Sequence, residues 1–425
     1  MFLEGEITIP SDKSMSHRAI ILGCLTKSEF TIKNLSLGED CQNTLKIFSQ
    51  LGIKYEFISK KDLKINSKDL FKNLDKEYVF DCGNSGTTTR LLMGLFSSIE
   101  GLKCTLTGDN SLSKRPMKRV IEPLLKMGAK IEHNDFKLPI KIEGKKLKGI
   151  TYFSPIPSAQ VKSCLLLAGL NAKGKTKVFE KVLSRNHSEI MLNYLGANIK
   201  TGKTEEGFFA EIENSILKPK DIEVVGDISS AAFFMVAPSI IPNSKVLIKN
   251  VGINPTRDGI IDVFKQAKID FEILNKREIS KELVADIKVN YTKNIFPFEI
   301  KGNIIPRLID EIPVLAVLAS RAKGKSKISD AKDLRNKESD RIKTIVETFR
   351  ELEINIEEFE DGFEIQGKDE EINKDITFKT HLDHRLAMSY YIISLLNKGK
   401  SKIEGFDCVN TSFPEFIELM NSLKK

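Results

Sequence analysis

Basic side chains at the starts of predicted helices and turns give the first indication of chemistry in this sequence. They occur in both halves of the chain, and together they could form one strongly positive site. A carboxylate that faced such a site could act as a general base, and Asp310 stands in one of these segments. This pattern predicts binding of small molecules that carry several phosphates and carboxylates. The basic residues are Lys13, Arg18, Arg90, Arg115, Lys337, Arg341 and Arg385.

A glycine-rich stretch at residues 83–90, G-N-S-G-T-T-T-R, is the strongest single candidate for an anion site. An apolar run at 78–80 predicts a strand before it, and residues 91–96 predict a helix after it. The first N–H groups of a helix lack partners within the helix, and they favour an anion together with the helix dipole. Arg90 is expected to add a positive charge in the first turn. An ordinary strand-to-helix turn is the alternative interpretation.

Further segments carry side chains that could contact the same ligands. Arg115 precedes Pro116, which is expected to hold it out of helical geometry. Lys337 and Arg341 are four residues apart, which predicts that they share one helix face and an anionic ligand. The alternative for this pair is a surface network with the neighbouring acids.

Another segment, at residues 158–160, is expected to open a helix. Ser158 is a predicted N-cap and Gln160 lies in the first turn, where both could instead donate to anionic oxygens. His381 and His384 lack a third ligand with convincing spacing, so no metal site is predicted.

The composition limits the class of protein. The chain has 425 residues, which predicts two or more domains. Its net charge of +8 comes without a basic block interleaved with aromatic residues, so nucleic-acid binding is not expected. No apolar run is long enough to span a bilayer, and no signal peptide is evident. The six scattered cysteines form no C-x-x-C pair, which favours a reduced, cytoplasmic location.

One pattern recurs along the chain: an amphipathic helix ends, a turn follows, and a strand begins. The turns fall at residues 52, 128, 196, 268 and 353, and the last two lack glycine. This period predicts six repeated units of helices and strands in two groups of three. A final helix near residues 414–420 has no strand after it, and residues 2–9 are expected to supply that strand. The N-terminus would then belong to the C-terminal half, with a crossover near 225–232.

Eight motifs, in this order, resemble those of 5-enolpyruvylshikimate-3-phosphate (EPSP) synthases, and the resemblance spans essentially the whole chain. The motifs are D-K-S-M-S-H-R at 12–18, G-N-S-G-T-T-T-R at 83–90, S-K-R-P-M at 113–117, S-A-Q-V-K-S at 158–163, G-D-I-S-S-A at 226–231, R-L-I-D-E-I-P at 307–313, K-E-S-D-R at 337–341 and D-H-R at 383–385.

The resemblance implies an α/β fold of two domains, each of three βαβαββ units, which form an inside-out α/β barrel with the active site in the interdomain cleft. The domains would be 1–12 with 227–425, and 13–226. The implied reaction transfers the enolpyruvyl group of phosphoenolpyruvate to the 5-hydroxyl of shikimate 3-phosphate and releases phosphate, in the shikimate pathway that leads to chorismate and aromatic amino acids. The resemblance implies no cofactor, no metal, no nucleic-acid or membrane partner, and a monomer.

The resemblance also implies roles for individual residues. Asp310 would accept the proton of the attacking hydroxyl, and Glu338 is a candidate for proton transfer to the methylene carbon. Residues implied for shikimate 3-phosphate are Lys13, Ser14, Arg18, Ser158, Ala159, Gln160, Asp310 and Lys337. Residues implied for phosphoenolpyruvate are Lys13, Asn84, Gly86, Arg115, Gln160, Arg341 and Arg385. In this family glyphosate occupies the phosphoenolpyruvate pocket beside the glycine that matches Gly86.

Two positions depart from the family pattern. Asp333 stands where many relatives have asparagine, and Thr411 where many have lysine. The wording of the first and third motifs is closer to the branch called class II than to the enteric branch. The alternatives are a UDP-N-acetylglucosamine enolpyruvyl transferase and a non-enzymatic polyanion binder. The former family uses a loop cysteine as acid, where this chain has Arg115.

Overall fold

The computed structural model describes residues 1–368 and 370–425, and the chain packs into two compact units. Unit 1 contains Met1–Asp12, Val225–Glu278 and Leu283–Lys425. Unit 2 contains Lys13–Val224 and the short segment Ile279–Glu282. The chain therefore passes from unit 1 to unit 2 after its first strand and returns at Val225.

Unit 2 has three four-stranded sheets among its described residues, each with one parallel and two antiparallel pairings. In spatial order they are β13 (Ile222–Glu223), β2 (Glu29–Lys33), β4 (Leu63–Asn66), β3 (Lys54–Phe57); β5 (Glu77–Asp81), β6 (Lys103–Thr107), β8 (Lys137–Glu143), β7 (Lys130–Asn134); and β9 (Thr151–Ser154), β10 (Thr176–Glu180), β12 (Gly207–Ile212), β11 (Ile199–Thr204). The helices are α1 (Lys13–Cys24), α2 (Glu39–Gln50), α3 (Gly86–Ser97), η1 (Leu112–Lys114), α4 (Lys118–Lys126), α5 (Ala159–Gly169) and α6 (His187–Tyr194).

Unit 1 repeats this plan with two four-stranded sheets and one two-stranded sheet in the described residues. They are β1 (Glu4–Thr8), β14 (Lys245–Gly252), β16 (Glu282–Asn290), β15 (Phe271–Ile279); β17 (Glu299–Ile300), β18 (Gly324–Ile328), β20 (Gly362–Gly367), β19 (Asn355–Phe359); and β21 (Ile376–Lys379), β22 (Ser401–Glu404). The helices are α7 (Ile228–Ile240), α8 (Gly259–Gln266), η2 (Gly302–Ile304), α9 (Ile305–Leu308), α10 (Ile312–Arg321), η3 (Lys332–Asn336), α11 (Arg341–Glu351), α12 (His384–Ser394), η4 (Phe406–Thr411) and α13 (Phe416–Leu423).

The N-terminal strand belongs to unit 1, where β1 pairs in parallel with β14. Ile7 and Ile9 of this segment are buried in the same apolar core as α7. The prediction that this strand completes the last repeat is wrong. It instead supplies the first strand of the sheet that continues with β14. Near the C-terminus β1 packs against α13, and Leu3 forms an isolated antiparallel bridge with Lys424.

All five predicted helix-to-strand turns place their turn residue in the left-handed region. The φ angles are 109° at Gly52, 91° at Gly128 and 82° at Gly196. Lys268 and Glu353 have φ of 52° and 57°, although left-handed backbone is costly for residues with a Cβ atom. The repeat is therefore a property of the backbone, and it persists where the glycine signal is missing.

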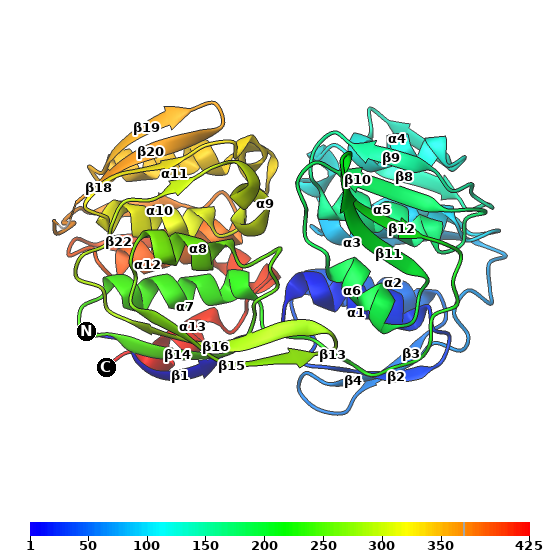
Figure 1. Cartoon of the computed structure of the whole chain (residues 1–425), viewed down its shortest axis with the longest axis horizontal. Coiled ribbons are helices and arrows are strands. Elements are labelled where there is room, and N and C mark those ends of the chain that lie inside the picture. Colours follow the sequence, from blue (N-terminus) through cyan, green and yellow to red (C-terminus); the bar gives the residue numbers. More distant parts are fainter. Residues whose placement is uncertain (369) are drawn as a thin grey trace. The chain divides into compact units, whose positions relative to one another are not determined.

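Apolar helices form the centre of each unit, and the sheets lie outside them. Every residue of α7 is buried, as expected for a helix that is apolar on all sides. In unit 1, α7, α10 and α12 pack against one another, and in unit 2 α3 packs against α5 (Figure 1). These central helices matter for function because the starts of α3, α5 and α12 carry the candidate site residues.

Candidate active site

In unit 1 the candidate site centres on Asp310, in the turn between α9 and α10. One carboxylate oxygen, Oδ1, lies 3.5 Å from Nζ of Lys337 and 3.5 Å from a terminal nitrogen of Arg341. Arg385 donates to the backbone carbonyl of Asp310 at 3.4 Å. Three cationic side chains, each distant in sequence from Asp310, therefore meet at this one acidic residue.

The prediction that Lys337 and Arg341 share a helix face is wrong. Lys337 follows η3 in extended geometry, with φ of −84° and ψ of −151°, and α11 begins only at Arg341. The physical reason is the N-cap: the carboxylate of Asp340 accepts from the backbone N–H of Lys343 and fixes the helix start there. The two side chains still converge, because the extended segment brings Lys337 toward Asp310.

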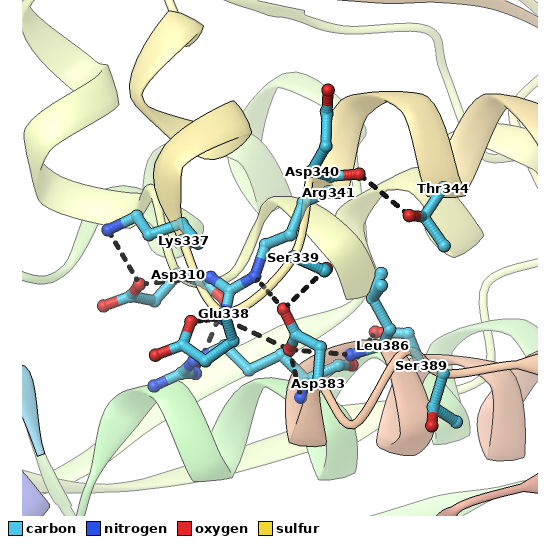
Figure 2. Close-up of polar contacts among 12 residues, drawn as sticks. Asp310, Lys337, Glu338, Ser339, Asp340, Arg341, Thr344, Asp383, Leu386 and Ser389 are labelled. Atoms are coloured by element: carbon cyan, nitrogen blue, oxygen red, sulfur yellow. Dashed lines mark hydrogen bonds and ion pairs between the residues drawn. The ribbon is translucent and has the colours of Figure 1, made fainter. Parts of the chain in front are cut away.

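Arg341 is held by the carboxylate of Asp383, the N-cap of α12 (Figure 2). Its Nε and one terminal nitrogen donate to the two carboxylate oxygens at 2.8 and 3.2 Å. The side chain of Arg341 is 1% exposed and that of Asp383 is 0% exposed. The same terminal nitrogen donates to Oε2 of Glu338 at 2.8 Å. Glu338 is thereby placed next to the Asp310 cluster.

The electrostatics of this pair favour both charged forms. Burial by itself raises the pKa of the Asp383 carboxyl, but the positive charge of Arg341 outweighs it and holds that pKa below its usual value. Burial lowers the pKa of Arg341, and the carboxylates of Asp383 and Glu338 more than reverse this effect. Arg341 is therefore a charged guanidinium held in place by its buried counter-ion, Asp383.

In unit 2 the first candidate group lies at the start of α1. Nζ of Lys13 is 2.5 Å from a carboxylate oxygen of Asp40 on α2. Arg18 is 4% exposed and donates to the hydroxyls of Ser188 and Ser163 at 2.7 and 2.8 Å. It also donates to the backbone carbonyl of Ser14 at 2.9 Å. The positions of Lys13 and Arg18 are thus fixed by polar groups from four helices.

The glycine-rich stretch forms the beginning of α3 itself. The helix starts at Gly86, because the side chain of Ser85 accepts from the N–H of Thr88 and caps it. Arg90 therefore lies in the second turn, and the prediction that it lies in the first turn is wrong. A Cβ atom at Gly86 would lie 2.8 Å from a terminal nitrogen of Arg90 and 3.4 Å from one of Arg115. Gly86 is therefore flanked by two guanidinium groups.

Arg115 lies beside this helix start. Its backbone is extended, with φ of −76° and ψ of 132°, which confirms the expectation from the following proline. Its terminal nitrogen donates to the side-chain oxygen of Asn84 at 2.8 Å. Asn84 in turn donates to Asp109 at 2.6 Å. The arginine is thus oriented by the glycine-rich stretch itself.

The start of α5 joins the same group. Ser158 is the N-cap of α5, as predicted, and its hydroxyl accepts from the N–H of Val161. Gln160 accepts from Arg90 at 2.7 Å and donates to the hydroxyl of Thr87 at 3.1 Å. Unit 2 therefore brings together residues from the starts of α3 and α5 with Arg115.

Several partners of these residues were not found from the sequence. Asp40, Ser163 and Ser188 lie within helices and carry no local signal of a role. Asp383 does carry one, since an aspartate directly before a predicted helix is a typical N-cap. Of the two departures from the family pattern, Asp333 lies 4.0 Å from Nζ of Lys337, and Thr411 ends η4.

Among residues 1–368 and 370–425, no group of three or more His, Cys, Asp or Glu side chains is arranged to hold a metal ion. None of the described helices combines the length and the apolar character needed to cross a bilayer. The cysteines are free thiols, and five of them are buried.

Comparison with known structures defines the class of protein. The chain superimposes on the enolpyruvyl transferase NikO from Streptomyces tendae with a TM-score of 0.77 at 13% identity, over 99% of this chain and 95% of that one. EPSP synthase from Acinetobacter baumannii gives a TM-score of 0.87 at 37% identity, over 99% of this chain and 96% of that one. The fold is that of the enolpyruvyl transferases.

Sequence comparison defines the family. Residues 2–420 match the profile of EPSP synthase (3-phosphoshikimate 1-carboxyvinyltransferase). The 3-phosphoshikimate 1-carboxyvinyltransferase of Thermoanaerobacter sp. (strain X514) is 45% identical over 423 residues, which cover 99% of this chain and 98% of that one. The corresponding protein of Bacillus subtilis (strain 168) is 42% identical over 426 residues, covering 100% and 98%. The chain belongs to the EPSP synthase family.

Proposed function

We propose that this protein transfers the enolpyruvyl group of phosphoenolpyruvate to the 5-hydroxyl of shikimate 3-phosphate and releases phosphate. Family membership over almost the whole chain supports this reaction. The observation that carries the proposal for the site is the convergence of Lys337, Arg341 and Arg385 on Asp310. Such a group combines anion ligands with a carboxylate that can take up a proton.

We assign the role of general base to Asp310. Phosphoenolpyruvate becomes electrophilic when its methylene carbon is protonated, and the 5-hydroxyl then attacks the adjacent carbon. The hydroxyl must lose its proton as the new carbon–oxygen bond forms, and Asp310 would accept it. Lys337 and Arg341 lie 3.5 Å from the same carboxylate oxygen of Asp310 and orient it.

The protonation of the methylene carbon is assigned to Glu338, with Lys337 as the second candidate. Glu338 is 23% exposed, so it is accessible while Arg341 holds one of its oxygens. The tetrahedral intermediate then loses phosphate by cleavage of its carbon–oxygen bond, and loss of a methyl proton restores the enol double bond.

The remaining side chains are proposed as substrate ligands. Arg341 and Arg385 would bind phosphoenolpyruvate, together with Lys13, Asn84, Gly86, Arg115 and Gln160. Their support is the cationic surroundings of Gly86. Lys13, Ser14, Arg18, Ser158, Ala159, Gln160 and Lys337 would bind shikimate 3-phosphate. A glyphosate molecule in the phosphoenolpyruvate site would then lie beside Gly86.

Four finer assignments are also proposals. The domain division into 1–12 with 227–425 and 13–226 is supported by the compact units, although Val225 and Gly226 pack with unit 1 and the tip of the β15–β16 hairpin packs with unit 2. Class II membership is supported by the motif wording. A monomer is the family expectation. A cytoplasmic location is supported by the absence of disulfides among the cysteines, all of which the structure describes.

Phosphate release from phosphoenolpyruvate tests this function directly. The purified chain is assayed with shikimate 3-phosphate, with UDP-N-acetylglucosamine, or with neither acceptor. We expect release only with shikimate 3-phosphate. Release with the nucleotide sugar would support the sister transferase. That reaction uses a loop cysteine, where this chain has Arg115. Salt-sensitive polyanion binding without any phosphate release would support the non-enzymatic alternative.

A further inference from the structure

A buried ionic cluster lies next to the start of α5. It contains Lys162 on α5, Glu180 at the end of β10 and Glu189 on α6. Nζ of Lys162 is 2.8 Å from a carboxylate oxygen of each glutamate. The three side chains are 2%, 2% and 5% exposed. Charged groups are rarely buried without a compensating role, so the cluster requires an explanation.

Glu180 differs from Glu189 in what its second oxygen does. Oε2 accepts from Lys162, whereas Oε1 accepts from the backbone N–H of Ser158 at 2.9 Å. The hydroxyl of Ser184 donates to both oxygens, at 2.7 and 2.8 Å. In the described residues Glu189 contacts the same lysine but not Ser158. Glu180 thus joins the ionic cluster to the N-cap residue of α5.

The charge state of the cluster is well defined. Burial lowers the pKa of the Lys162 amine, but the two glutamates outweigh burial and hold that pKa above its usual value. The amine stays protonated, so it fixes the orientation of the Glu180 carboxylate. That orientation leaves Oε1 directed at the backbone N–H of Ser158. Ser158 is the N-cap of α5, and Gln160 lies in its first turn.

We propose that Glu180 is a positioning residue that sets the start of α5 for binding of shikimate 3-phosphate. The proposal rests on the proposed function, in which Ser158 and Gln160 contact that substrate. Glu180 acts on the backbone of Ser158 and through it on Gln160, which also joins Arg90 and Thr87. A small shift of this first turn would move all of the donors that it carries.

Matched isosteric variants, E180Q and E189Q, separate positioning from general stabilisation. Each removes one negative charge beside Lys162 at the same distance and with little change in volume. In E180Q the amide oxygen stays with Lys162 and Ser184, which places the amide NH2 opposite the N–H of Ser158. In E189Q the amide oxygen keeps its contact with Lys162, and Ser158 is not affected.

The readouts are KM and kcat for both substrates, calorimetric binding of shikimate 3-phosphate, and thermal unfolding of each variant. We expect E180Q to raise KM and Kd for shikimate 3-phosphate about tenfold, since a donor replaces a buried acceptor. E189Q should leave KM and Kd within about twofold of wild type, because the hydrogen bond from Ser158 to Glu180 is kept. This holds even if E189Q lowers the unfolding temperature as much as E180Q does.

The proposal is overturned if E180Q binds shikimate 3-phosphate as wild type does, or if E189Q weakens binding equally. If E180Q does not fold, E180D replaces it in the test. The shorter aspartate keeps the negative charge near Lys162 but withdraws the carboxylate from Ser158. E180D should therefore also raise the KM for shikimate 3-phosphate. Wild-type chain that releases no phosphate would contradict the proposed function itself. Active wild type with an unchanged E180Q would contradict only the role of Glu180.

Discussion

Replacement of Asp383 by asparagine should destabilise unit 1 markedly. Asparagine is also a good N-cap, so the bonds from the N–H groups of Arg385 and Leu386 are retained. What is lost is the counter-ion of Arg341, a guanidinium that is 1% exposed. Removal of one partner of a buried ion pair costs about 3–5 kcal/mol. Glu338 still contacts Arg341 at 2.8 Å, which places the expected cost near the lower end, about 3 kcal/mol.

The pH dependence of this effect has a definite sign. The pKa of Asp383 is lowered by folding, so its contribution to stability is complete above the unfolded value of about 3.9. That contribution is lost as the pH falls through the lower pKa of the folded state. The difference between wild type and D383N should therefore be constant from about pH 6 to 8 and shrink below about pH 4.

Thermal and denaturant unfolding at several pH values measure this prediction. About 3 kcal/mol corresponds to a fall in Tm of roughly 6–12 °C for a unit of this size. D340N is the matched control, because Asp340 is also an N-cap with an arginine partner, Arg335 at 3.0 Å, but the pair is 35% and 23% exposed. The D340N substitution should lower the free energy of unfolding by no more than about 1 kcal/mol. A D383N variant no less stable than D340N at pH 7 would refute the buried-pair reasoning.

Three further predictions follow from the site. Asp310→Ala should lower kcat by about 100- to 10,000-fold with little change in either KM, as measured by phosphate release; near-wild-type turnover would exclude Asp310 as the base. Gly86→Ala should fold, because its Cβ atom meets only the flexible ends of Arg90 and Arg115. It should also raise the glyphosate concentration needed for half-inhibition, and an unchanged inhibition curve would contradict the steric account. Cys82 and Cys104 have pKa values raised to about 12 by burial, so a thiol reagent at pH 8 should react with them only after denaturation. Rapid reaction of the folded protein would show that these thiols are accessible.

Local signals gave the most reliable predictions from the sequence. The N-cap at Ser158 and the extended geometry of Arg115 were both predicted, because each depends on residues next to it in the chain. The starts of α3 and α11 differ from the prediction because they are set by the caps Ser85 and Asp340, which are equally local signals. A serine or aspartate directly before a helical pattern therefore indicates where the helix starts.

Long-range partners could not be predicted in this way. Arg341 meets Asp383 across 42 residues, and Arg18 meets Ser188 across 170. Nothing in the local sequence selects these partners, because packing of the apolar helices brings them together. The family resemblance supplied the names of candidate ligands, but the groups that orient them, such as Asp40 and Glu180, became visible only in the folded chain.

The pairing of β1 with β14 has a consequence for the order in which the chain folds during translation. Glu4 lies opposite Lys245, so β1 leaves the ribosome long before its partner strand has been made. Residues 13–224, by contrast, supply nearly all of unit 2 before that partner exists. Domains generally fold as units while synthesis proceeds, and contacts between distant residues form slowly. Unit 2 is thus placed to fold first, while the nascent N-terminal strand stays unpaired until the sheet that receives it has been synthesised.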